Sequence, residues 1–145
     1  MAVVQGKQMP YWKCYYHIVW ATKHREPIIT PAYEPIIFAA IQDKCAEFES
    51  SLLAINAVAD HIHVAVCIPP SIAVSKWIGS AKGSTARAVN TSFELATRFH
   101  WQGSYGVMSF GEKVLPQVKS YIDNQKQHHA AGTVNQYLEQ IGNEE

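Results

Sequence analysis

Strand-like and helix-like segments follow one another along this chain in an order that only a few folds accommodate. The strand-like segments, rich in β-branched and aromatic residues, are 14–23, 52–57, 61–68 and 105–110. The helix-like segments, in which apolar residues recur at helical spacing, are 32–50, 71–90 and 113–129. The predicted order is β-α-β-β-α-β with one added helix, which is the split βαβ arrangement. We therefore expect an α+β, ferredoxin-like fold with an antiparallel sheet, helices on one face and an added C-terminal helix.

Proline and hydroxyl residues locate the expected helix starts. Thr30 and Pro31 precede the first helix as a cap and a first-turn proline. Ser71 is predicted to cap the second helix, and Pro116 is tolerated in the first turn of the third. Residues 133–141 open with a weak capping box, which predicts a short helix outside the core.

The length and hydrophobic content are those of one compact unit. With 145 residues, of which 48% are hydrophobic, we expect a single domain over residues 1–145 with a peripheral tail from residue 131. No apolar run is long enough to span a membrane, and the first residues lack a secretory pattern, so a cytoplasmic location is expected. Cys14, Cys45 and Cys67 form no C-x-x-C pair and are expected to be reduced core thiols.

Basic and acidic residues are balanced in number but not in position. The chain has 12 of each, so it has no net attraction to a polyanion. From residue 61 to residue 93, however, there are three bases, Lys76, Lys82 and Arg87, and no acid. These three are candidate DNA phosphate contacts on the second helix, and the alternative is an ordinary solvated helix surface.

The motif Asp60-His61-Ile62-His63 begins the predicted third strand. Because side chains alternate along a strand, His61 and His63 point to one face, about 7 Å apart, and Ile62 points to the other. Two imidazoles in this arrangement can bind one metal ion. Taken alone the pair is a weak indication, since two hydrogen-bonded histidines give the same pattern.

A second motif, Tyr121-Ile122-Asp123-Asn124-Gln125, falls in the predicted third helix. The i,i+4 spacing places Tyr121 and Gln125 on one face, one turn apart. This arrangement allows the amide oxygen of Gln125 to bind the same ion while the Tyr121 hydroxyl lies close by. The alternative for Tyr121 alone is a half-buried residue of an amphipathic helix.

Together these motifs resemble the HUH endonucleases, in which a His-hydrophobic-His pair and a tyrosine on a helix share one site. More narrowly, the sequence resembles the single-tyrosine transposases of small bacterial insertion sequences, the IS200-like family that includes the REP-associated tyrosine transposases. The matching stretches are YYHIVWATKHREPII, DHIHVAVCIPP, WIGSAKGSTARAV, YGVMSFGEK and YIDNQKQHH, in that order. They cover most of residues 14–130.

The resemblance implies both a site and an activity. It implies metal ligands His61, His63 and Gln125 and the nucleophile Tyr121. The implied activity is cleavage and rejoining of single-stranded DNA at the ends of a mobile element through a 5′-phosphotyrosine, with a DNA hairpin as substrate. The implied assembly is a homodimer in which the tyrosine helix of one subunit can act in trans.

The residue types suit that chemistry. A tyrosine nucleophile conserves the energy of the broken phosphodiester, so rejoining needs no ATP. Two neutral imidazoles and an amide leave a divalent ion with its full double charge, which offsets charge on the phosphate oxygens. Mg²⁺ is expected from its availability, although imidazole ligands suit Mn²⁺ better.

Several other polar or aromatic residues have two interpretations each. Asp60 either orients a ligand histidine or is only a turn residue. His128 and His129 either contact DNA or end a helix favourably. Trp101 either packs in an irregular stretch or stacks on a base.

Two other functional classes remain as alternatives. The first is a catalytically inactive or domesticated, ferredoxin-like module that binds single-stranded nucleic acid, although the aromatic strand signature of RNA-recognition domains is missing. The second is a β-barrel metalloenzyme such as an oxygenase, which needs a carboxylate and a third histidine on strands. The long helical patterns count against the second class.

Overall fold

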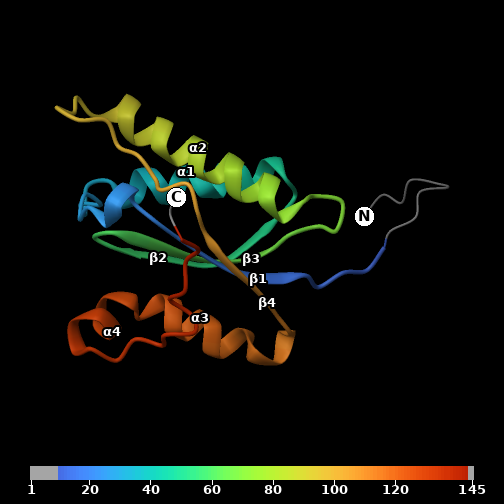
Figure 1. Cartoon of the computed structure of the whole chain (residues 1–145). Helices are drawn as coiled ribbons and strands as arrows, with labels where there is room; N and C mark the ends of the chain where they lie inside the picture. Colours follow the sequence, from blue (N-terminus) through green and yellow to red (C-terminus); the bar gives the residue numbers. More distant parts are fainter. Residues whose placement is uncertain (1–9, 144–145) are drawn as a thin grey trace.

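The computed structural model describes residues 10–143, and a four-stranded antiparallel sheet forms their centre (Figure 1). The strands are β1 (Tyr15–Ala21), β2 (Ser51–Val58), β3 (His61–Cys67) and β4 (Gly106–Phe110), in the order β2-β3-β1-β4. The α-helices are α1 (Glu34–Glu47), α2 (Val74–Ser92), α3 (Leu115–Asp123) and α4 (Gln125–Ala131). Short 3₁₀ helices cover Lys23–Arg25 and Glu112–Val114. The expected α+β, ferredoxin-like fold is confirmed.

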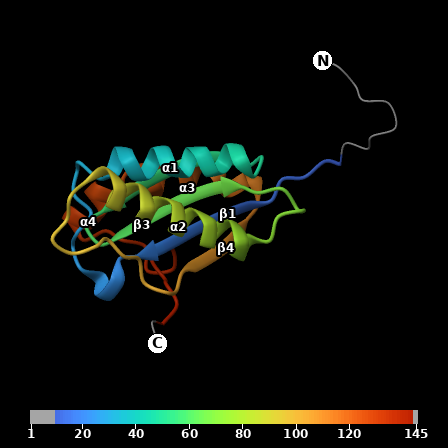
Figure 2. The same cartoon turned by 90° about the horizontal axis from the view of Figure 1, so that it is seen from above.

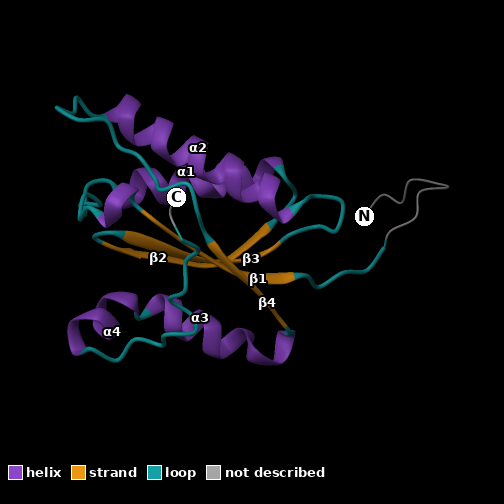
Figure 3. Ribbon diagram, in the orientation of Figure 1, coloured by secondary structure: helices purple, strands orange, loops and turns teal. Residues whose placement is uncertain are grey.

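The helices form a layer on each side of the sheet. Helices α1 and α2 cover one face, and the added helices α3 and α4 lie against the other (Figures 1 and 3). Seen from above, α1 and α2 lie over the sheet and pack against each other (Figure 2). Within residues 10–143, none of the helices has both the length and the apolar character needed to cross a bilayer.

Strand β3 is buried on both faces and divides its side chains between the two helical layers. Ile62 and Val64 belong to the large hydrophobic core, which also contains Trp77 of α2. His61 and His63, which alternate with these apolar residues, face the α3 and α4 side. The period of two in the sequence therefore places the histidines on the face opposite the main core.

Helix α3 packs on the sheet over small side chains. Ala54 of β2 and Ala65 of β3 form a second cluster with Val118 and Ile122 of α3. The side-chain amide of Asn56 donates to the backbone oxygen of Ile122 at 3.0 Å. Alanines on the sheet allow the helix to approach closely, and Asn56 bonds a carbonyl near the end of α3, so α3 is held at a fixed position.

Two helix starts differ from the predicted ones. Helix α1 begins at Glu34 with Pro35 in its first turn, rather than directly after Pro31. Helix α2 begins at Val74, and Ser71 makes no capping bond in the structure. The reason is a turn after the proline pair, in which the Ile72 N–H bonds to the oxygen of Pro69 and delays the helix.

The predicted third helix is divided at Asn124, whose φ of −105° and ψ of 22° are not helical. The Asn124 amide donates to the backbone oxygen of Ser120, which closes α3 locally. The predicted helix over residues 133–141 is wrong, because this segment forms turns. Beyond these turns the tail runs beside β4, where the Gly142 N–H donates to the oxygen of Tyr105 at 3.3 Å.

The tryptophans differ in how deeply they are buried. Trp20 and Trp77 are fully buried, whereas Trp12 is only partly buried. Trp101 packs edge-on against Trp20 and Phe99, and its indole N–H donates to Thr85. Trp101 therefore has a packing role in this conformation. All three cysteines are free, with Cys45 buried and the other two partly buried.

Candidate active site

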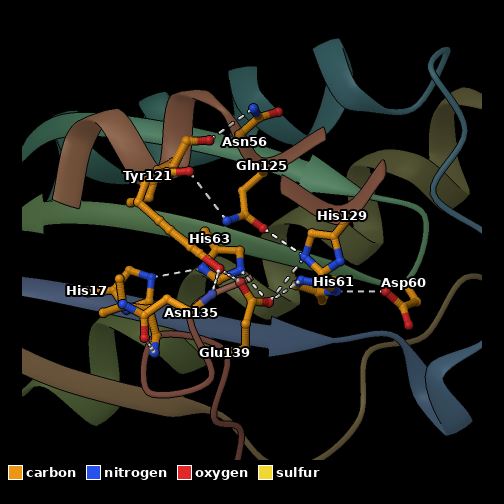
Figure 4. Close-up of polar contacts among 12 residues, drawn as sticks. His17, Asn56, Asp60, His61, His63, Tyr121, Gln125, His129, Asn135 and Glu139 are labelled. Carbon is orange, nitrogen blue, oxygen red and sulfur yellow. Dashed lines mark hydrogen bonds and ion pairs between the residues drawn. The ribbon is translucent and has the colours of Figure 1, made fainter. Parts of the chain in front are cut away.

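Two histidines of β3 and a tyrosine of α3 lie together on the α3 and α4 side of the sheet (Figure 4). The ring centroids of His61 and His63 are 5.1 Å apart, and those of His63 and Tyr121 are 6.0 Å apart. Each histidine is 1% exposed. The structure thus brings two predicted ligands and the predicted nucleophile into one site within a single chain.

Asp60 orients the ring of His61 from the β2-β3 turn. Its Oδ1 lies 2.7 Å from Nδ1 of His61, and its Oδ2 accepts a bond from the Arg25 guanidinium at 3.3 Å. Because a carboxylate only accepts, Nδ1 of His61 carries a proton and Nε2 faces the site. That buried Nε2 has no hydrogen-bond partner among the described residues. The geometry therefore favours the orienting role for Asp60.

His17 of β1 contacts the second imidazole. Its Nε2 lies 2.8 Å from Nδ1 of His63, and the two rings stack with centroids 5.0 Å apart. Burial, with a smaller effect of the nearby His63, lowers the pKa of His17 to about 3, so His17 is neutral near pH 7. Sequence reasoning missed His17, although a histidine within the aromatic and β-branched segment 14–23 was a visible signal.

The Tyr121 hydroxyl is held by two partners. It donates to Oε2 of Glu139 and accepts from the Asn135 N–H at 2.8 Å. The Tyr121 ring stacks on His128, with centroids 4.7 Å apart. Burial raises the pKa of Tyr121, and the bond to Glu139 raises it further. The phenol therefore needs assistance before it can act as an oxyanion.

Helix α4 supplies Gln125 and His129, one turn apart. Gln125 is fully buried, and its Oε1 lies 3.1 Å from Nε2 of His129. The His129 ring is 4.8 Å from that of His61. The predicted amide ligand thus lies beside the histidine cluster, and His129, whose role the sequence left open, belongs to the cluster.

Glu139 enters the site from the C-terminal tail. Its Oε1 lies 2.9 Å from Nε2 of His61 and 3.1 Å from Nε2 of His63. Nε2 of His129 is 3.3 Å away. The contact with His63 has hydrogen-bonding geometry, whereas the one with His61 does not. Sequence reasoning missed Glu139, since no local pattern in the tail marks it and only the folded path brings it to the histidines.

The donor atoms fit a divalent metal ion. One ligand atom each from His61, His63, His129 and Glu139 lies within 4.8 Å of the others. For an ion that holds its ligands at about 2.1 Å in an octahedron, adjacent ligands are about 3 Å apart. Oε1 of Glu139 has that spacing to the three Nε2 atoms, and the unpartnered Nε2 of His61 has the chemistry of a ligand. A donor set this rich in imidazole suits Mn²⁺ or Zn²⁺ better than Mg²⁺.

The two histidines of β3 differ in their electrostatic surroundings. Burial lowers the pKa of His61, but contacts with Asp60 and Glu139 outweigh burial and raise it. For His63 burial dominates, and its pKa is lowered. Burial disfavours the ionised form of Glu139, yet the histidine contacts hold its pKa below the usual range. Of the two rings, His61 is therefore the one that takes up a second proton more readily.

The three predicted phosphate contacts are separated from this cluster. Lys76, Lys82 and Arg87 all belong to α2, across the sheet from the histidines (Figure 1). Lys76 and Arg87 are exposed. The ammonium group of Lys82 instead donates to the backbone oxygens of Gln102 and Ser104, at 2.6 and 3.0 Å. DNA contact by these bases stays a prediction, and Lys82 is already engaged within the chain.

Residues 10–125 match the family model described as Transposase IS200 like. This chain belongs to the IS200-like transposase family. The transposase is 27% identical over 126 residues to the transposase for insertion sequence element IS200 of Salmonella typhimurium, covering 83% of this chain and 82% of the relative. It is 22% identical over 115 residues to the ISDra2 transposase TnpA of Deinococcus radiodurans, covering 76% and 82%. The resemblance inferred from the motifs is confirmed.

Two solved structures share the fold of this transposase. A putative transposase from Deinococcus radiodurans R1 aligns with a TM-score of 0.64 at 24% identity, covering 86% of this chain and 98% of that chain. A REP-associated tyrosine transposase bound to a REP hairpin aligns with a TM-score of 0.62 at 16% identity, covering 90% and 76%. At these identities the likeness concerns the fold alone.

Proposed function

We propose that this transposase cleaves and rejoins single-stranded DNA by transesterification through Tyr121. The observation that supports it best is the carboxylate of Glu139, which contacts the nucleophile with one oxygen and the histidine cluster with the other. A single small anion therefore spans the space between the Tyr121 hydroxyl and the candidate metal ligands. A scissile phosphate is an anion that can span the same space.

In the proposed reaction the Tyr121 oxygen attacks the scissile phosphorus and the bond from phosphorus to the 3′ oxygen breaks. The products are a 5′-phosphotyrosine and a free 3′-hydroxyl. The phenolic proton leaves Tyr121, and one proton reaches the departing 3′ oxygen. The Asn135 N–H already donates to the Tyr121 oxygen, so it stabilises the phenolate form. Attack by another 3′-hydroxyl reverses these steps and rejoins the strands.

The proposed metal site consists of His61, His63 and Gln125, with His129 and Glu139 as further donors when DNA is absent. When bound, the ion offsets negative charge on the phosphate oxygens. Asp60 keeps Nε2 of His61 directed into the site. Mg²⁺ is the candidate by availability, and the imidazole donors favour Mn²⁺.

Glu139 occupies the place that the substrate requires. Its Oε1 has the spacing of a metal ligand to the Nε2 atoms, and its Oε2 accepts the bond from Tyr121. A phosphate and a carboxylate repel each other and cannot fill this position together. We therefore expect Glu139 to leave the site when DNA binds.

The proposed substrate is a DNA hairpin at the ends of a mobile element. This assignment is supported by the shared fold with a transposase whose structure contains a REP hairpin. The homodimer and the cytoplasmic location expected from the sequence stay predictions.

Incubation with single-stranded DNA that carries a hairpin from the gene's own flanks tests the proposal. With Mn²⁺, the wild-type protein should give a covalent protein–DNA band on a denaturing gel. Tyr121→Phe should give no band and still bind the DNA, because only the nucleophilic oxygen is lost. Tyr137→Phe, at an exposed tail tyrosine, is the matched control and should keep the band. A covalent adduct formed by Tyr121→Phe would place the nucleophile elsewhere.

A nucleic-acid-binding module without catalysis is the second candidate. Exclusion of a phosphate by Glu139 in this conformation favours it. In that case the wild-type protein should bind the hairpin but form no adduct with Mg²⁺, Mn²⁺ or Zn²⁺.

A further inference from the structure

The Nδ1 atoms of the two β3 histidines contact different kinds of side chain. Nδ1 of His61 meets the carboxylate of Asp60, which is partly exposed in the β2-β3 turn. Nδ1 of His63 meets the imidazole of His17 at 2.8 Å, inside the sheet. A carboxylate can only accept a hydrogen bond, whereas a neutral imidazole can donate from one nitrogen and accept at the other.

His17 lies where an apolar side chain would pack more favourably. It is 1% exposed, and its Nδ1 has no hydrogen-bond partner among the described residues. A buried polar atom without a partner destabilises a fold. The strand around it, from Tyr15 to Ala21, is otherwise aromatic and aliphatic. Packing alone therefore does not explain a histidine here.

The register of the sheet directs His17 toward His63. His17 of β1 pairs with Ala65 of β3, and His63 lies two residues from Ala65 on the same strand. His17 and His63 therefore lie on the same face of the sheet, as diagonal neighbours. Ala65 presents only a methyl group opposite His17. The His17 ring therefore leans over that of His63, and the two stack at an angle of 24°.

The bond between the two rings must change direction when metal binds. Nε2 of His63 lies 3.1 Å from Oε1 of Glu139, so without a metal ion this nitrogen would carry the proton and Nδ1 would accept from the His17 Nε2–H. As a metal ligand His63 would use the lone pair of Nε2, so its proton would lie on Nδ1 and point at His17. His17 then accepts at Nε2 and carries its own proton on Nδ1. Each ring holds one proton in both states.

We propose that His17 is a positioning residue that holds the His63 ring as a neutral metal ligand. Its Nε2 accepts a hydrogen bond from the His63 Nδ1–H when metal is bound, and donates a hydrogen bond to Nδ1 of His63 when it is not. The inference rests on the proposed metal site. Neither an aspartate nor a lysine at position 17 can fill both roles, since one only accepts and the other only donates. An amide can fill both.

Two substitutions at position 17 separate positioning from packing. His17→Leu is similar in volume and removes both nitrogens, and His17→Gln keeps one donor and one acceptor. Tyr15→Leu, on the same face of the same strand, loses the stacking of Tyr15 on Phe110 and leaves the ligands untouched. It serves as the control for a general loss of stability in β1.

The measurement is the affinity for Mn²⁺ by titration calorimetry, together with the unfolding temperature of each metal-free protein. We expect His17→Leu to weaken binding about 10- to 100-fold. His17→Gln should retain affinity within a few-fold. Tyr15→Leu should lower the unfolding temperature and leave affinity unchanged. In ¹⁵N spectra of the imidazoles, the Zn²⁺-loaded wild-type protein should carry the His63 proton on Nδ1.

Each contrary result has a distinct meaning. Equal affinity of wild-type protein and His17→Leu would overturn the role of His17 and leave the metal site intact. Equal weakening by Leu and Gln, in step with lost stability, would reduce His17 to a packing residue. No binding of Mn²⁺ or Zn²⁺ by the wild-type protein would overturn the proposed metal site and this inference with it.

Discussion

Burial and neighbouring carboxylates together decide how readily each histidine of the β3 pair takes up a proton. His61 lies between Asp60 and Glu139, and His63 contacts Glu139 and the neutral ring of His17. The pKa of His61 is raised for this reason, while burial lowers that of His63. Of these two rings, His61 is the one at which protons are expected to compete with the metal ion more strongly.

Metal binding should therefore weaken as the pH falls. A ligand nitrogen must be unprotonated, so Mn²⁺ affinity should rise with pH and level off above the raised pKa of His61. In Asp60→Asn one of the two carboxylates that raise this pKa is gone and burial still lowers it, so the midpoint should move to lower pH. The plateau affinity should fall about 10- to 100-fold, because the ring is held less firmly. Calorimetry from about pH 5 to about pH 8 measures both effects. An unchanged midpoint in Asp60→Asn would remove His61 as the titrating ligand.

Two bases of α2 should have different roles: we expect Lys82 to stabilise the fold and Arg87 to bind DNA. Lys82 bonds two backbone oxygens, so Lys82→Ala should lower the free energy of unfolding by about 1–2 kcal/mol. Its effect on the salt dependence of DNA binding should be small. Arg87 is exposed, so Arg87→Ala should leave stability unchanged and reduce the log–log salt slope by about one unit. Chemical denaturation and binding assays over a salt series check both. Equal salt slopes for Arg87→Ala and the wild-type protein would show that Arg87 is a solvated surface residue without a phosphate contact.

Local patterns predicted some residues of the site and not others. His61 and His63 share a face because strand alternation is a local property. His17 and Glu139 join them only through the β1-β3 pairing and the path of the tail, which are long-range contacts. The placement of the His pair was therefore predictable from its own motif, while its partners depended on the fold.

Among the elements, the C-terminal tail departs most from the sequence prediction. Its turns carry Glu139 into the site, and Gln140 then passes so close to β4 that a side chain on Gly106 would collide with its backbone oxygen. A weak capping box indicated a helix here, but contacts with β4 and the histidines outweigh that preference. The break at Asn124 has a similar cause, because Asn56 on the sheet bonds the last two carbonyls of α3, those of Ile122 and Asp123.

Removing the charge of Glu139 should raise cleavage and weaken metal binding. Glu139→Gln keeps the shape of the side chain but loses the anion that competes with the scissile phosphate, so adduct should form faster at limiting DNA. Affinity for Mn²⁺ without DNA should fall, since an amide is a weaker ligand than a carboxylate. Gel-based single-turnover assays and calorimetry give the two quantities. Loss of cleavage in Glu139→Gln would instead identify Glu139 as a base that Tyr121 needs.

A substitution far from the histidines should also raise the rate of cleavage. Gly106→Ala leaves Glu139 intact but forces the tail away from β4 at Gln140. The carboxylate should then leave the site part of the time, and cleavage should rise as it does in Glu139→Gln. Gly103→Ala, where the added methyl meets open space, is the matched control. Equal rates for Gly106→Ala and wild-type protein would show that the tail does not restrain the site.

For the whole molecule, the sequence predicted the order of elements but not which sheet face α3 and α4 would cover. Alternating strand and helix patterns yield the β2-β3-β1-β4 sheet through standard connections. The position of α3 depends on Ala54 and Ala65 facing Val118 and Ile122, which is a match between distant surfaces. Lys126 of α4 strengthens it through bonds to Asn56 and Glu34.

These contacts bear on whether the site forms within one chain or between two. The family resemblance implied that the tyrosine helix can act in trans. In the described chain, α3 and α4 are bonded to their own β2 through Asn56, and Tyr121 lies beside the histidines of the same chain. Exchange of the helices between subunits would have to break these bonds and re-form them with the partner's β2, whereas the described arrangement needs no exchange. We therefore expect the site to act in cis.

Mixing two inactive proteins tests this expectation. His61→Ala removes a metal ligand and Tyr121→Phe removes the nucleophile, so in cis assembly every site of a mixed dimer carries one defect and the mixture should stay inactive. In trans assembly, one site of each mixed dimer carries both defects and the other carries neither. Random pairing would then restore about a quarter of the wild-type sites. Covalent adduct formation measures recovery, and differently tagged subunits report whether dimers form and exchange. Recovery near a quarter would overturn the cis assignment, and would mean that α3 and α4 leave their own sheet to serve a partner.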